Sequence, residues 1–148
     1  MKILLATDGS VHSKIVLEKV AARLFPPNTE LLIVSAFENS LLIMSSPAPM
    51  GGLGGYYEEA DAIARQLAED AVKNAAKFLE EKTISLKITT AVIEGSAKSI
   101  ILKEAETFGA DLIIVGSHGA GATERFLLGS VSQAVALHAK CSVEIVRK

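Results

Sequence analysis

The stretch DLIIVGSHGAGATERFLLGSV, residues Asp111–Val131, is the best guide to the architecture of this chain. Its apolar run LIIV predicts a buried strand that stops at Gly116, and Gly119 follows three positions later. After nine intervening residues, Gly129 and Ser130 open a predicted helix. Glycine lets backbone N–H groups approach phosphate oxygens, and the N-terminus of a helix attracts anions. The stretch therefore predicts that a ligand with a phosphate group binds between this strand and this helix.

Predicted strands and helices alternate along the whole chain on both sides of this stretch. Alternation of this kind predicts parallel βαβ units with right-handed crossovers, and thus a doubly wound α/β fold with helices on both faces of one sheet. The predicted strands are Lys2–Thr7, Leu31–Phe37, Leu86–Ile93, the LIIV run and Ser142–Arg147; the predicted helices are Val11–Leu24, Glu58–Glu81, Ala97–Thr107 and Ser130–Ala139.

Apolar residues at helical spacing indicate which helix faces should pack on the sheet. In the first helix these are Ile15, Val16, Val20 and Leu24; in the second they are Ile63, Leu67, Ala71, Ala75 and Leu79. Ser10 and Ser96 are the expected N-caps of the first and third helices, and Gly109 is the expected terminator of the third.

Three turns should meet at one edge of this sheet: Thr7–Ser10, Glu94–Ser96 and Gly116–Gly119. Each follows a predicted parallel strand, so all lie at the carboxyl edge, where ligands of doubly wound sheets bind. Glu94 and Gly95 are read mainly as a turn near the pocket, in which Gly95 could let a ligand approach. The expected binding site is therefore built from several turns that are far apart in the sequence.

The segment Glu38–Tyr57 interrupts the alternation, since it holds two prolines, four glycines and the apolar cluster Leu41–Met44. Connections in α/β units usually have about 2 to 6 residues, so a segment of this length is an outlier. We expect either a mobile loop or a lid or subunit-contact segment, with the apolar cluster partly buried.

Length and composition predict a single globular domain. The chain has 148 residues, of which 49% are hydrophobic and 22% are charged, and no apolar run approaches the roughly 20 residues that span a bilayer. The first residues do not have the pattern of a signal peptide. A net charge of -2 with scattered Lys and Arg gives no footprint for nucleic acid. We expect a cytoplasmic protein without nucleic-acid or membrane partners, in which the single Cys141 is a small buried residue.

The glycine pattern is not one of the two commonest nucleotide motifs, because the chain has no G-x-x-x-x-G-K-[ST] and no G-x-G-x-x-G after its first strand. Instead Gly116, Gly119, Gly129 and Ser130 fill the pattern G-2x-G-9x-G-[ST]. This pattern resembles the ATP-binding signature of the universal stress protein family, and the resemblance extends over nearly the whole chain. It implies an adenine-nucleotide alpha-hydrolase-like sheet of five parallel strands in the order 3-2-1-4-5. It also implies a homodimer formed through the last strand, which would otherwise leave an unpaired edge.

The resemblance assigns a role in ATP binding to ten residues. Asp8, with Thr7 beside it, would accept hydrogen bonds from the ribose hydroxyls, and the backbone of Ala36 would face the adenine. Four residues would line the ribose and phosphates: Gly116, Ser117, His118 and Gly119. Gly129, Ser130 and Val131 would offer N–H groups and a hydroxyl to the phosphates, and any Mg²⁺ would be held largely by the phosphates.

Purely structural interpretations compete with several of these roles. Asp8 could be a turn-former or N-cap, and the His118 ring could simply pack in its turn while the backbone N–H does the binding. Arg125, inside the nine-residue spacer, could pair with phosphate or be solvated. The glycines themselves could be strand-to-helix punctuation, although that explains less well why so many of them fall at one edge. We assign no role to His12 or His138, and we propose no residue as a metal ligand.

The preferred hypothesis for function is an ATP-binding regulatory switch in the stress response. The enzyme alternative is slow ATP hydrolysis or self-phosphorylation on Ser117 or Ser130. A receiver-like signalling domain is disfavoured because the third strand ends in Glu94 where such a domain would carry its phosphoacceptor Asp. A dimeric scaffold without nucleotide is the last alternative, and the intact glycine pattern disfavours it.

Overall fold

The computed structural model describes residues 1–38, 54–83, 85–119 and 128–147. Its centre is one parallel sheet of five strands in the order β3-β2-β1-β4-β5, as the resemblance implied. The strands are β1 (Lys2–Ala6), β2 (Thr29–Phe37), β3 (Leu86–Glu94), β4 (Leu112–Gly116) and β5 (Ser142–Val146). The order reverses beside β1, and the two outer strands are β3 and β5.

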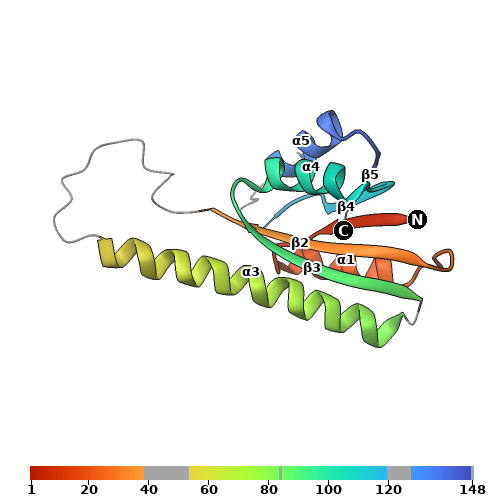
Figure 1. The fold of residues 1–148 in the computed structure, drawn as a ribbon, viewed down its shortest axis with the longest axis horizontal. Helices are drawn as coiled ribbons and strands as arrows, with labels where there is room; N and C mark the ends of the chain where they lie inside the picture. Colours follow the sequence, from red (N-terminus) through yellow and green to blue (C-terminus); the bar gives the residue numbers. More distant parts are fainter. Residues whose placement is uncertain (39–53, 84, 120–127, 148) are drawn as a thin grey trace.

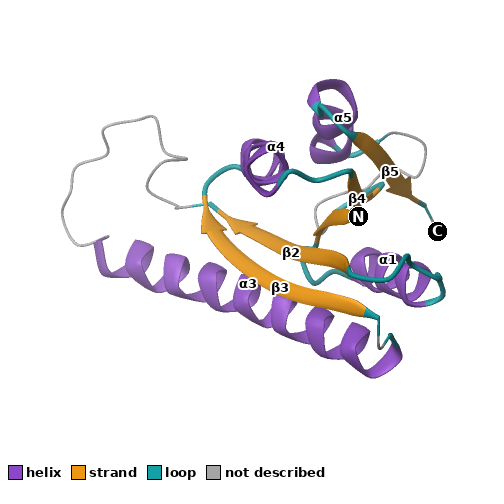
Figure 2. Ribbon diagram, turned by 45° about the vertical axis from the view of Figure 1, so that its right-hand side comes forward, coloured by secondary structure: helices purple, strands orange, loops and turns teal. Residues whose placement is uncertain are grey.

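Helices cover both faces of the sheet, so the predicted doubly wound architecture is confirmed (Figures 1 and 2). The helices α1 (Val11–Ala21) and α3 (Gly54–Lys82) share one face, while α4 (Ala97–Phe108) and α5 (Ser130–His138) share the other. Successive residues of β1 point to opposite faces: Ile3 and Leu5 belong to the core under α1 and α3, and Leu4 belongs to the core under α4 and α5. All three side chains are fully buried, which is why the central strands read as unbroken apolar runs.

The helix caps follow the predicted positions. The Ser10 hydroxyl accepts a hydrogen bond from the backbone N–H of Ser13 (3.3 Å), which caps α1. Ser96 occupies the N-cap position of α4 without a side-chain cap bond. Gly109 ends α4 in the left-handed conformation at φ 69°, where glycine has no Cβ to strain.

The first helix is shorter than predicted, and the prediction for Leu24 was wrong. Helix α1 ends at Ala21, and Leu24 lies beyond it with its side chain fully exposed. The helical spacing therefore ran past the end of the helix, before Pro26 and Pro27.

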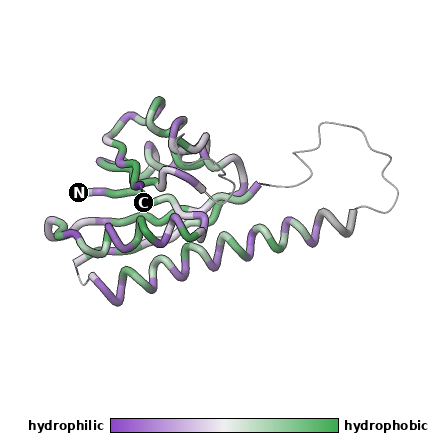
Figure 3. The backbone as a smooth tube through the Cα atoms, turned by 180° about the vertical axis from the view of Figure 1, so that it is seen from behind, coloured by the Kyte–Doolittle hydropathy of each residue, from purple (hydrophilic) through white to green (hydrophobic). Residues whose placement is uncertain are grey.

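Helix α3 is longer than predicted, because it begins at Gly54 and takes in the last residues of the predicted loop Glu38–Tyr57. The rest of that loop, residues 39–53, lies outside the described residues. Ala71, Ala75 and Leu79 are buried as expected, but Ile63 and Leu67 are more than half exposed. Ala68 is buried although it follows Leu67 directly, so the face of α3 that packs on the sheet lies about 100° around the helix axis from Leu67. Residues four apart are offset by about 40°, so the predicted row has turned away from this face by Leu67 and Ile63. The first turns of α3 also extend past the sheet in Figure 1, and the tube in Figure 3 alternates between hydrophilic and hydrophobic colours along the helix.

In the described part of the chain, no helix has the length and apolar content needed to cross a membrane.

Candidate functional site

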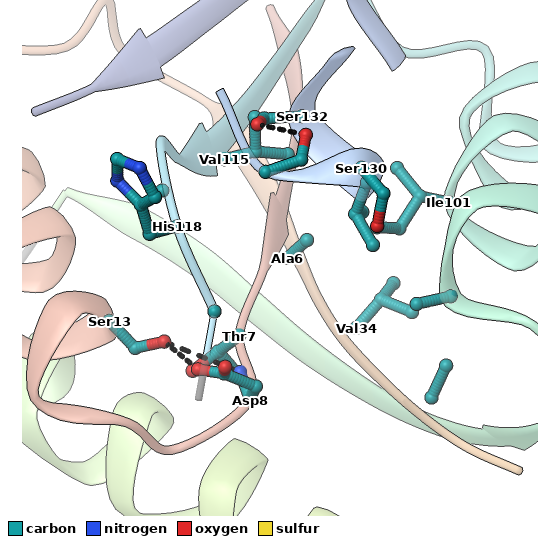
Figure 4. Close-up of a pocket in the computed structure, with 16 residues that line it drawn as sticks. Ala6, Thr7, Asp8, Ser13, Val34, Ile101, Val115, His118, Ser130 and Ser132 are labelled. Atoms are coloured by element: carbon teal, nitrogen blue, oxygen red, sulfur yellow. Dashed lines mark hydrogen bonds between the residues drawn. The ribbon is translucent and has the colours of Figure 1, made fainter. Parts of the chain in front are cut away.

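A pocket of about 410 Å³ opens at the carboxyl edge of the sheet, beside the point where the strand order reverses. It is bordered by the ends of β1, β2 and β4 and by the first turns of α1, α4 and α5 (Figure 4). Nine of the ten residues that the family resemblance predicted line it: Thr7, Asp8, Ala36, Gly116, His118, Gly119, Gly129, Ser130 and Val131. The tenth, Ser117, is buried behind the lining. Residues from separate parts of the sequence thus converge on one cavity.

Asp8 forms the turn that its structural alternative predicted, and it also lines the pocket. Its carboxylate Oδ1 accepts hydrogen bonds from the backbone N–H of Ser10 (3.0 Å) and from the Ser13 hydroxyl. Thr7 is buried, and its hydroxyl accepts from the N–H of Gly9 (3.3 Å). Because Gly9 has φ 71° and a Cβ there would lie 3.2 Å from the Cβ of Ala71, this turn requires glycine. The turn and the binding role of Asp8 are therefore compatible.

An added Cβ at any of the three motif glycines would make a tight contact with other atoms of the protein. A Cβ at Gly116 would lie 3.2 Å from the carbonyl oxygen of His118, and one at Gly129 would lie 3.2 Å from that of Ser117. A Cβ at Gly119 would lie only 2.9 Å from Oδ2 of Asp8. From the sequence we expected these glycines to let a ligand approach the backbone. In the structure they also let the turn, helix α5 and Asp8 approach one another.

Ser117 joins three elements at the back of the pocket. Its N–H donates to the carbonyl of Val146 at the end of β5 (2.8 Å), and its own carbonyl accepts from the N–H of Gly129 (2.8 Å). The buried Ser132 hydroxyl donates toward the carbonyls of Ser117 (3.1 Å) and Gly129 (2.9 Å). The N–H of Gly129 is therefore used internally, which corrects the expectation that it would be offered to phosphate. The N–H groups of Ser130 and Val131 stand in the first turn of α5, where a helix has no internal acceptors for them.

The hydroxyls of the two candidate phosphoacceptors have different surroundings. Ser117 is buried and its hydroxyl oxygen lies 2.9 Å from Nδ1 of His118, whereas Ser130 is exposed and lines the pocket. Of the two, only Ser130 is therefore accessible from the pocket.

The His118 ring packs in the turn, as its structural alternative predicted. Its centroid lies 6.0 Å from that of the His12 ring at the start of α1. Its Nδ1 is engaged with Ser117, and its Nε2 is buried with no hydrogen-bond partner among the described residues. Among the described residues, neither a carboxylate nor a backbone carbonyl accepts a hydrogen bond from this ring, as would be expected for a catalytic acid or base.

Sequence reasoning missed the apolar wall of the pocket and two serines. The wall is formed by Ala6, Val34, Ala97, Ile101 and Val115; the serines are Ser13 and Ser132. Val34 and Val115 had been read only as strand residues, although the last residues of parallel strands border such sites. Neither Glu94 nor Gly95 is among the lining residues. Arg125 lies outside the described residues. Within the described residues, no three His, Cys, Asp or Glu side chains are grouped to hold a metal ion.

The family model described as the universal stress protein family matches residues 1–147. The chain belongs to this family. A putative universal stress protein of Staphylococcus epidermidis is 31% identical over 150 residues, which cover 98% of this chain and 82% of the relative. The resemblance suggested by the glycine pattern is thereby confirmed.

Solved structures of universal stress proteins and their relatives share the fold. The hypothetical protein MJ0577, solved as a test case for assigning biochemical function from structure, has a TM-score of 0.83 and 26% identity, with 99% of this chain and 95% of that chain covered. A universal stress protein family member from Arabidopsis thaliana, described with AMP bound, has a TM-score of 0.70 and 17% identity, with 100% and 92% covered. At the latter identity the likeness establishes the fold alone.

Proposed function

We propose that this universal stress protein binds ATP in the pocket at the carboxyl edge and acts as a nucleotide-dependent regulatory switch in a stress response. The observation that carries the proposal is the convergence on one cavity of nine residues that the family resemblance predicted. They come from four segments spread from Thr7 to Val131, and all four meet at the carboxyl edge of the sheet. The AMP described with the Arabidopsis neighbour supports an adenine nucleotide as the class of ligand.

The pocket offers a separate environment to each part of the nucleotide. The wall formed by Val34, Ile101 and their neighbours is apolar and suits a planar base. Asp8 stands on one side of the pocket and Ser130 on another, as Figure 4 shows. We place the ribose at Asp8, which is acceptor-only when ionised, and the phosphates at the first turn of α5. A Mg²⁺ ion would arrive with the phosphates, which supply most of its ligands.

Calorimetric titration with ATP, ADP and AMP tests the proposal. Because the helix N-terminus should attract the more highly charged phosphate chain, we expect ATP to bind more tightly than AMP. Absence of heat or saturation at millimolar nucleotide would refute ATP binding.

A matched pair of variants tests the placement of the phosphates. Ser130→Asp puts a negative charge in the first turn of α5, where it should stabilise the helix but repel a phosphate. We expect this variant to bind ATP at least roughly tenfold more weakly, while the isosteric Ser130→Asn changes the affinity much less. Equal losses in both variants would place the phosphates elsewhere.

The proposed switch acts through a cytoplasmic homodimer, whose interface runs along β5 and continues to Arg147. Strand β5 is an outer strand, paired only with β4, and such edges are natural sites for pairing with a second copy. The end of β5 also contacts the turn that borders the pocket, through the hydrogen bond from the N–H of Ser117 to the carbonyl of Val146. Sedimentation over a range of concentrations, with and without ATP, tests this part. A monomer under every condition would remove the dimer, without affecting the calorimetric test of binding.

A further inference from the structure

Ser13, in the first turn of α1, is a buried residue whose hydroxyl is directed at Asp8 (Figure 4). The hydroxyl donates to Oδ1 of the Asp8 carboxylate, and its oxygen accepts from the backbone N–H of the same residue (3.3 Å). The backbone of Ser13 is itself fixed, since its N–H donates to the capping hydroxyl of Ser10. Packing of the buried Val16 and Val20 against the sheet anchors the rest of the helix. Ser13 therefore connects the core to the carboxylate.

The Asp8 carboxylate is constrained at both of its oxygens. Oδ1 receives the Ser13 hydroxyl and the N–H of Ser10, while Oδ2 lies against Gly119, where there is no room for a Cβ. The two donors at Oδ1 set the orientation of the carboxylate, whose two oxygens together offer about four acceptor sites. A side chain that is already oriented loses less conformational freedom when a ligand binds.

We propose that Ser13 is a positioning residue: it orients the Asp8 carboxylate so that the pocket binds nucleotides with ribose hydroxyls more tightly than nucleotides without them. The inference rests on the proposed function, because it requires a nucleotide whose ribose lies at Asp8. Ser13 does not have to touch the nucleotide. Its contribution is to hold the acceptor in the orientation that the 2′ and 3′ hydroxyls require.

The test compares calorimetric titrations with ATP and with 2′,3′-dideoxy-ATP, which lacks both hydroxyls. For Ser13→Ala we expect affinity for ATP to fall roughly three- to tenfold, while affinity for dideoxy-ATP stays unchanged. In an Asp8→Ala background the same Ser13→Ala change should have no further effect on either ligand, because the group it orients is absent. Urea unfolding of each variant confirms that it is folded at the temperature of the titration.

Ser99→Ala is the matched control. Ser99 holds the same position in α4, two residues beyond the first helical residue, but it is exposed and does not line the pocket. We expect it to leave both affinities unchanged.

Each outcome of the titrations decides something. If Ser13→Ala weakens ATP and dideoxy-ATP equally, Ser13 only supports the fold and the inference is overturned. It is also overturned if neither affinity changes, or if the unmodified protein binds the two ligands equally well. If the unmodified protein binds neither, the proposed function itself has failed, a result that is distinct from a failure of Ser13 alone.

Discussion

Replacing Gly119 by alanine should push the glycine turn against Asp8 and destabilise the protein. The new Cβ would lie 2.9 Å from Oδ2 of Asp8, whereas ordinary contacts begin at 3.4 Å, so one of the two groups must move by about 0.5 Å. The carboxylate cannot simply rotate away, because the Ser13 hydroxyl and the N–H of Ser10 hold it. The φ angle of Gly119 is not in the left-handed region, so alanine should not strain the backbone.

The expected cost follows from this one contact. Overpacking of this kind costs typically 1–3 kcal/mol, and the exposed setting of the turn places Gly119→Ala near the lower end, at about 1 to 2 kcal/mol. In an Asp8→Ala background the obstructing oxygen is gone. Gly119→Ala should then be neutral or stabilise the protein by up to about 0.5 kcal/mol, because alanine lowers the conformational entropy of the unfolded chain. The two positions should therefore show a coupling energy of about 1 to 2 kcal/mol.

A double-mutant cycle by urea unfolding measures this coupling. The four proteins needed are the unmodified chain, Gly119→Ala, Asp8→Ala and the double variant, compared at equal m-values. Additive effects, within about 0.3 to 0.5 kcal/mol, would show that Gly119 is not constrained by Asp8 and would refute the reasoning.

Three further predictions concern parts of the molecule away from the pocket. Gly109→Ala should lower the free energy of unfolding, measured in urea, by about 1 kcal/mol, because Gly109 has a φ of 69°, which strains a residue with a Cβ. No atom lies within 4 Å of the added Cβ, so the cost comes from the backbone alone, and nucleotide affinity should not change. The pKa of the Cys141 thiol is raised by burial and by the charge of Asp111, so its alkylation at pH 8 should be slower than that of an exposed thiol. Asp111→Asn should speed the alkylation, and equal rates in the variant and the unmodified protein would contradict a role of Asp111. Arg23 follows α1 and forms an ion pair with Glu144 of β5, whose hydrogen bonds raise the pKa of Arg23. Glu144→Gln should therefore lower the free energy of unfolding by up to about 1 kcal/mol at low salt, and by less at high salt.

The fold was predictable from the sequence because its periodic signals are local. Unbroken apolar runs mark strands buried on both faces, and alternation with helices restricts the topology to parallel crossovers. The errors occurred where a periodic pattern was extended too far. Leu24 continued the spacing of α1 beyond the end of the helix, and Ile63 and Leu67 belong to a row of four-residue steps that has turned away from the buried face of α3. Helical spacing shows which side chains lie near one another, but not where a helix ends or which of two adjacent rows packs on the sheet.

Much of the candidate site was predictable for a similar reason, since the carboxyl ends of parallel strands meet at one edge. The chemistry of the wall was not, because Val34 and Ile101 look like any other core residues in the sequence. Cys141 was expected to be buried and is only half-buried, since the residues around it come from several elements.

The glycine stretch shows where these two kinds of information divide. Its spacing alone placed a strand end and a helix start beside each other and indicated an anionic ligand, because those properties belong to short segments of backbone. Only the tertiary structure assigned the glycines to their neighbours: Gly129 to the Ser117 carbonyl, and Gly119 to Asp8. These contacts join residues far apart in the chain, and their distances depend on how the sheet and helices pack.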